Sequence, residues 1–137
     1  LAGQAFANAP VAVVHALAYP VGGHFHIPHG LSNSLVLPAV LRFNEPEAAH
    51  LYAELYDCLN ANSQGSVADR SRAFIALLES MIAESGLPAT LRDAGIVEDF
   101  LPTLAQDAML QQRLLINNPR EVAYDDALAI YQQAYAG

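Results

Sequence analysis

Residues 15–30 read HALAYPVGGHFHIPHG, a stretch that contains four of the chain's five histidines. Proline and glycine interrupt helices, so this stretch predicts a helix that ends at Pro20, a loop over residues 20–29 and a second helix from about Leu31. The fold therefore depends on a helix, turn and helix whose histidines are either incidental or part of a metal site.

His15 and Tyr19 lie four residues apart and therefore share one face of the first predicted helix. His29 stands at the start of the second helix, where the positive end of the helix dipole disfavours a protonated imidazole. A histidine that ligates a metal must be neutral, so this position favours ligation. The spacing of fourteen residues between His15 and His29 nevertheless matches neither a zinc finger nor an HExxH pair. Spacing alone leaves both a metal site and incidental histidines open.

The other potential ligands and nucleophiles are predicted to have structural or solvated roles. His24 and His26 flank Phe25 and are expected on opposite sides of an extended loop. His50 is expected at the boundary of an apolar helix face. Cys58 has no basic neighbour in the sequence, so we expect a buried, inert thiol.

Apolar periodicity predicts helices along most of the chain and no strand, so the expected fold is all-α. Asn44 is expected to cap a helix over residues 45–60, and Ser66 a further helix that ends at Gly86. Other helical segments are expected at residues 1–10, in a short turn over 88–95, over 97–113, and, after a break at INNPR (116–120), over 124–135.

Composition narrows the class of protein. The 137 residues include no lysine and carry a net charge of −8, so we expect no nucleic acid as a partner. No apolar run is long enough to span a membrane, and one cysteine gives no internal disulfide, which together predict a cytoplasmic protein without a membrane partner. Only 15% of the residues are charged, and the sequence opens at Leu1 in mid-pattern. We therefore expect part of a larger protein, with one apolar face that packs against another domain or subunit.

A longer stretch, HALAYPVGGHFHIPHGLSNSLVLPAVLRFN (residues 15–44), resembles the signature of the iron-containing (group III) alcohol dehydrogenase family. The likeness continues in GLPATLRDAGI, LAQDAM, NNPR and DDALAIYQQAY. The resemblance implies a multi-helix, bundle-like domain similar to the C-terminal half of dehydroquinate synthase-like and iron-type alcohol dehydrogenases. Residues 1–137 would form this single domain, truncated at its N-terminus and without the N-terminal dinucleotide-binding domain.

The resemblance also implies a metal site. His15 and His29 match two of four protein ligands to a divalent ion, Fe²⁺ or in some relatives Zn²⁺. The other two ligands, an aspartate and a histidine one helical turn apart, are implied to lie upstream of Leu1. Tyr19 stands where many relatives have a histidine associated with the cofactor ribose and a proton relay. A phenol exchanges its proton less readily than an imidazole at neutral pH, so the relay role of Tyr19 is a hypothesis.

In full-length members of the family the implied reaction interconverts an alcohol or hydroxyacid and its carbonyl compound with NAD or NADP. The isolated 137 residues are then expected to be inactive, and their exposed face predicts self-association as a homodimer. Two alternatives remain open at this point. One is a helical interaction module that keeps the family fold without catalysis, and the other is an independent metal carrier built on His24 and His26.

Overall fold

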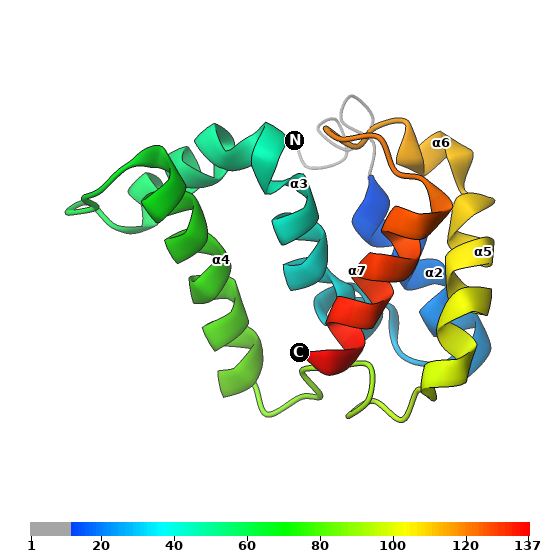
Figure 1. Cartoon of the computed structure of the whole chain (residues 1–137). Helices are drawn as coiled ribbons and strands as arrows, with labels where there is room; N and C mark the ends of the chain where they lie inside the picture. The colour runs from blue at the N-terminus through cyan, green and yellow to red at the C-terminus, as the bar shows by residue number, and fades with distance from the viewer. Residues whose placement is uncertain (1–11) are drawn as a thin grey trace, which may run out of the picture.

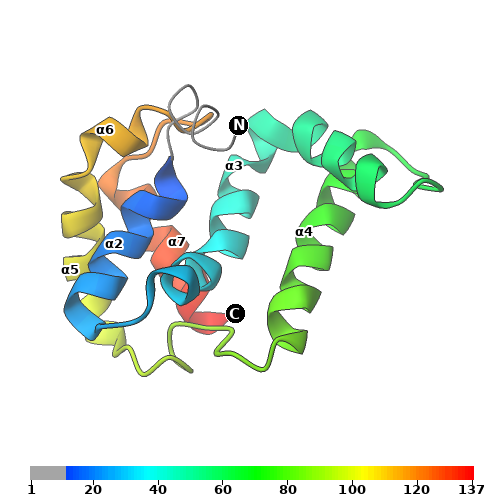
Figure 2. The same ribbon diagram turned by 180° about the vertical axis from the view of Figure 1, so that it is seen from behind.

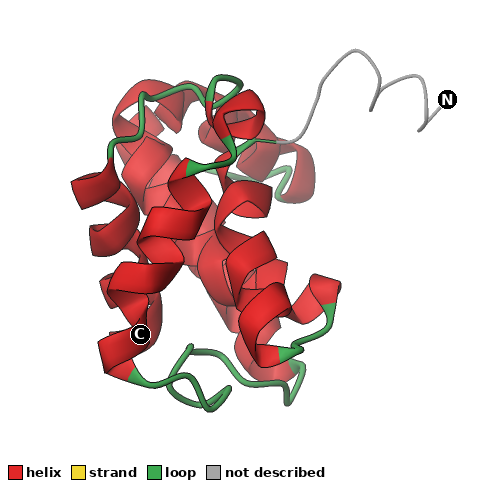
Figure 3. Cartoon of the chain, turned by 90° about the vertical axis from the view of Figure 1, so that its right-hand side faces the viewer, coloured by secondary structure: helices red, strands yellow, loops and turns green. Residues whose placement is uncertain are grey.

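The structure, a computed structural model, describes residues 12–137. These residues form helices joined by loops, with no strand among them (Figures 1 and 3), so the predicted all-α fold is confirmed. The helix expected over residues 1–10 lies outside the described residues. The elements are α2 (Val13–Phe25), α3 (His29–Leu59), α4 (Val67–Glu84), the 3-10 helix η1 (Glu98–Phe100), α5 (Leu101–Met109), α6 (Gln112–Leu115) and α7 (Tyr124–Ala136).

Two apolar cores hold these helices together. The larger core gathers side chains from α2, the first part of α3, α5, α6 and α7, and Figure 1 shows α2, α5 and α7 on one side of α3. The smaller core joins the second part of α3 to α4 on the other side, mainly through Tyr52 and Phe74. α3 is thus the element that both cores share.

Pro20 does not end its helix. α2 continues through Pro20 to Phe25, so the predicted loop over residues 20–29 is wrong. Proline has a helical φ angle, but it lacks the N–H that would bond the carbonyl four residues earlier, and its ring crowds that carbonyl. Its cost, about 3 kcal/mol in a helix interior, is offset here because Pro20 is buried and Val21 packs in the larger core.

α3 is one long helix rather than two. It begins at His29, earlier than predicted, and continues for 31 residues through Pro38 and Pro46. The predicted separate helix over residues 45–60 is therefore a continuation of α3. Figure 1 shows that α3 bends and that its last turns reach across toward the start of α4. A proline such as Pro46 is the usual cause of a bend of this kind.

Asn44 does not cap a helix, as predicted, but lies buried inside α3. Its side-chain amide exchanges two hydrogen bonds with Asn118, at 2.9 and 2.7 Å. Beside this pair, the guanidinium of Arg120 donates to the carbonyl of Phe43 at 2.8 Å and lies 4.1 Å from the centre of the Phe43 ring. Residues 116–120, predicted only as a break before the last helix, therefore fasten to the middle of α3.

The start of α4 follows the prediction. The Ser66 hydroxyl accepts a hydrogen bond from the backbone N–H of Asp69 at 3.2 Å, and the Asp69 carboxylate accepts one from the backbone N–H of Ser66 at 3.0 Å. The Ser66 side chain and then its backbone hold the pKa of Asp69 below its usual value. α4 ends at Glu84, just before Gly86, as expected.

The C-terminal third is confirmed in part. The turn expected over residues 88–95 is present and closes at Gly95, whose φ is +86°. The helix predicted over residues 97–113 is divided into η1, α5 and α6. α7 has the predicted apolar face, with Tyr131 among its buried residues. Within the described part of the chain, no helix combines the length and hydrophobicity needed to cross a bilayer.

Replacing Asn118 with alanine should lower the free energy of unfolding by about 2 kcal/mol. The reason is that Asn44 would stay buried with part of its amide unpaired. Equilibrium urea denaturation measures the change. Asn62→Ala in an exposed loop is the control and should stay within about 0.5 kcal/mol of the parent. Equal losses in the two variants would contradict the role of the Asn44–Asn118 pair.

Candidate metal centre

The connection between α2 and α3 brings two histidines together. His26 follows α2 with a left-handed φ of 53°, and the chain then turns back tightly. A Cβ atom on Gly22 would lie 3.3 Å from the carbonyl oxygen of Ile27, so glycine permits this close return. Figure 2 shows the start of α3 lying beside α2 after the reversal. His29 is thereby placed against the face of α2 that carries His15.

Three aromatic rings form what we call the ring cluster: His15, Tyr19 and His29. The ring centres of His15 and His29 are 5.3 Å apart, and Tyr19 stacks on His29 at 5.9 Å with an interplanar angle of 25°. Tyr19 and His15 are 6.4 Å apart on one helix face, as predicted. Tyr19 is 44% exposed and His29 is also exposed, so the cluster is accessible from solvent.

The surroundings of His15 favour an unprotonated ring, and a neighbouring amide holds the ring of His29 in place. Burial lowers the pKa of His15, and the neighbouring His29 lowers it further. A neutral imidazole keeps a lone pair available for a metal. The side-chain amide nitrogen of Asn33, one helical turn after His29, lies 3.1 Å from Nε2 of the His29 ring. Sequence analysis missed Asn33, although its spacing of four residues from His29 on one helix is the signal for such a contact.

The donor set of the ring cluster fits part of a metal site. Imidazole nitrogens suit divalent ions such as Fe²⁺ and Zn²⁺, which take at least four ligands or three and a water. Among residues 12–137 there is no group of three or more His, Cys, Asp or Glu side chains placed to hold a metal ion. Two imidazoles are fewer ligands than such a site needs, so a metal site at the ring cluster would require further ligands from outside the described residues.

The remaining histidines and the cysteine do not join the cluster. Nε2 of His24 lies 2.5 Å from a carboxylate oxygen of Asp107, and its ring packs edge-on against another ring of the η1 segment. His26 and His50 are exposed, which for His50 differs from the predicted boundary position. Cys58 is also exposed, so its predicted burial is wrong. It lies on the last turn of α3, on a side that neither core covers.

Comparison with known proteins identifies the family. Residues 1–135 match the C-terminal part of the Fe-containing alcohol dehydrogenase family. The chain belongs to this family. It is 44% identical to long-chain-alcohol dehydrogenase 1 of Geobacillus thermodenitrificans over 138 residues, which cover 100% of this chain and 35% of the relative. It is 30% identical to lactaldehyde reductase of Escherichia coli over 136 residues, or 98% of this chain and 35% of that enzyme.

Solved structures of iron-type alcohol dehydrogenases have the same fold. A 1,3-propanediol oxidoreductase matches with a TM-score of 0.90 and 34% identity, and an alcohol dehydrogenase from Oenococcus oeni matches with a TM-score of 0.89 and 30% identity. Each match covers 98% of this chain and 35% of the other. The predicted resemblance is confirmed, and the chain spans about a third of the length of these relatives.

Proposed function

We propose that residues 1–137 are the metal-binding domain of a longer, NAD(P)-dependent iron-type alcohol dehydrogenase. The enzyme interconverts an alcohol or hydroxyacid and its carbonyl compound. The observation that carries this proposal is the approach of the His15 and His29 rings to 5.3 Å, from two different helices, in a chain of this family. Relatives named as alcohol dehydrogenases and a lactaldehyde reductase support a small-molecule alcohol or aldehyde substrate.

In this proposal His15 and His29 hold a divalent ion, Fe²⁺ or Zn²⁺, through unprotonated ring nitrogens. The ion, when bound, supplies Lewis-acid chemistry by polarising the substrate oxygen. His15 suits the role because its lowered pKa keeps the ring neutral at neutral pH. We assign the remaining ligands, an aspartate and a histidine, to a segment upstream of Leu1.

We assign to Tyr19 the role of transferring the proton of the substrate alcohol. Its ring stacks on that of His29, and its partial exposure leaves the hydroxyl accessible to a substrate bound at the cluster. The hydroxyl is both a donor and an acceptor, so it is able to take the proton that an alcohol releases on oxidation while it passes its own proton to solvent. The hydride leaves for NAD or NADP, which we assign to a separate N-terminal dinucleotide-binding domain.

The proposal also includes the localisation and oligomeric state of the enzyme, which we infer to be a cytoplasmic homodimer. The exposed side chains of Leu51, Leu55 and Leu59 follow one another at successive turns of α3 and offer an apolar face to a second domain or subunit. The net charge of −8 supports a partner other than nucleic acid.

Removing either histidine should empty the metal centre, because each contributes a direct ligand. In the complete enzyme that carries this chain, His15→Ala and His29→Ala are each expected to abolish stoichiometric binding of iron or zinc. Elemental analysis of the purified proteins measures the loss. His50→Ala is the matched control, since His50 is an exposed histidine on the same helix as His29.

Two results would contradict this proposal. One is metal retained in full by both variants, and the other is a complete protein that binds no iron or zinc at all. The second result would favour the helical interaction module that keeps the family fold without catalysis.

Tyr19→Phe should lower kcat by about 100-fold, the lower range for loss of a general acid–base group, while leaving the metal content unchanged. The substitution removes only the hydroxyl and keeps the ring that stacks on His29. Steady-state oxidation of an alcohol, followed by NAD(P)H absorbance, measures kcat. Tyr124→Phe serves as the control on α7. An unchanged kcat in Tyr19→Phe would remove Tyr19 from the proton path.

The isolated chain of 137 residues should show no NAD(P)-dependent oxidation of alcohols and should bind Zn²⁺ weakly. It supplies two of the ligands and contains no glycine-rich dinucleotide fingerprint. Absorbance of NAD(P)H and calorimetric titration with Zn²⁺ test these two expectations. Turnover by the isolated chain would show that the dinucleotide site was assigned to the wrong part of the protein.

A further inference from the structure

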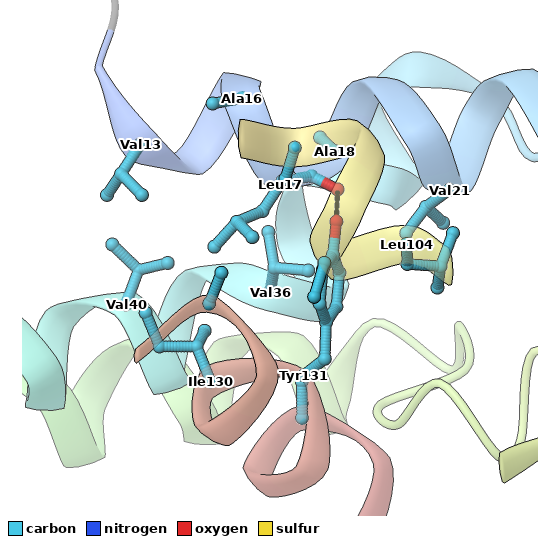
Figure 4. Close-up of a cluster of buried hydrophobic side chains, with 14 of the residues drawn as sticks. Val13, Ala16, Leu17, Ala18, Val21, Val36, Val40, Leu104, Ile130 and Tyr131 are labelled. Carbon is cyan, nitrogen blue, oxygen red and sulfur yellow. Dashed lines mark hydrogen bonds between the residues drawn. The ribbon is translucent and has the colours of Figure 1, made fainter. Parts of the chain in front are cut away.

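Tyr131 joins α7 to the part of α2 that carries the ring cluster. Its side chain is fully buried, and its hydroxyl donates a hydrogen bond to the backbone carbonyl of Leu17 at 2.6 Å (Figure 4). Leu17 lies midway between His15 and Tyr19, the two members of the cluster that α2 contributes. A contact at Leu17 therefore acts on the single helical turn that separates them.

This turn of α2 is also the one that Pro20 weakens. Proline has no N–H, so Ala16 cannot receive its helical hydrogen bond from position 20, and the proline ring pushes against that carbonyl. Leu17 carries the next carbonyl along the helix. A donor from α7 at this point ties the weakened turn to a second helix, and Figure 4 shows the bond crossing from one helix to the other within the larger core.

The hydroxyl of Tyr131 is fixed as a donor. Burial raises the pKa of Tyr131 above its ordinary range, and the carboxylate of Asp107 adds to this effect. The side chain packs among apolar neighbours from α2 and α5, including Val21 and Leu104, which leave it little freedom to turn away (Figure 4). The hydroxyl of Tyr131 therefore stays protonated and donates to the carbonyl of Leu17 from within the packed core.

We propose that Tyr131 is a positioning residue for the metal centre. Through the carbonyl of Leu17 it sets the turn of α2 that presents His15 toward His29, so that the two imidazoles approach closely enough to share an ion. Tyr131 touches neither the ion nor the substrate. The part of this inference that concerns the ion rests on the proposed function. The part that concerns the placement of the two rings rests on the structure alone.

The test replaces Tyr131 with phenylalanine in the complete enzyme, which removes the hydroxyl and keeps the ring. Titration of metal-free protein with Zn²⁺ should show binding about tenfold weaker than in the wild type, the lower range for the loss of an outer hydrogen bond at a metal site. The nuclear Overhauser effect between the ring protons of His15 and His29 should weaken in the metal-free protein. Tyr135 is another tyrosine of α7, and Tyr135→Phe is the matched control. It should change neither the Zn²⁺ affinity nor the nuclear Overhauser effect between the two histidine rings.

A double-mutant cycle tests whether Tyr131 acts through the proline-weakened turn. In Pro20→Ala, position 20 supplies its own N–H to Ala16, so Tyr131→Phe should weaken Zn²⁺ binding by less than it does beside Pro20. If Tyr131→Phe weakens Zn²⁺ binding equally in the Pro20 and the Pro20→Ala proteins, Tyr131 does not act through the turn that Pro20 weakens.

The remaining outcomes separate the two proposals. A Tyr131→Phe variant that unfolds at a lower temperature but keeps full Zn²⁺ affinity and the full ring contact has lost only stability, which would overturn the positioning role. A wild-type enzyme that binds no Zn²⁺, in which Tyr131→Phe still weakens the contact between His15 and His29, would uphold the positioning role and refute the proposed function.

Discussion

The fold depends on helices that continue through prolines, and beside two of these prolines a distant side chain bonds to the helix backbone. Tyr131 donates to the carbonyl of Leu17, and Arg120 donates to the carbonyl of Phe43. Each of these carbonyls lies three residues before a proline inside its helix. Each proline removes the donor to the carbonyl four residues earlier, so the carbonyls that lose their helical partner are those of Ala16 and Arg42, next to the ones that Tyr131 and Arg120 bond. The C-terminal part of the chain thus fastens α2 and α3 at turns that their prolines weaken.

The geometry of the ring cluster follows from this continuity. If α2 ended at Pro20, His15 and His29 would be joined by a flexible loop of about ten residues, and their separation would vary. In the structure only residues 26–28 separate the two helices, so the position of His29 relative to His15 is set by helix packing. Side chains held on packed helices are positioned more precisely than side chains on a loop.

Local features were predictable from the sequence, and contacts between distant segments were not. The capping box at Ser66 and the apolar face of α7 each depend on residues within a few positions of one another. The pairing of Asn44 with Asn118 spans 74 positions, and neither residue carries a local signal for it. For the same reason Asn44 was predicted as a helix cap. The ring cluster was expected only through resemblance to a family, because the spacing between its histidines is not itself distinctive.

The histidine-rich stretch is neither a single metal site nor a set of incidental residues. His15 and His29 meet at the ring cluster, which is the part suited to chemistry. His24 pairs with Asp107 and so fastens the last turn of α2 to α5, while His26 adopts the left-handed conformation that ends α2. Two of the four histidines therefore meet in the ring cluster, and the other two shape the end of the helix and the turn that bring those rings together.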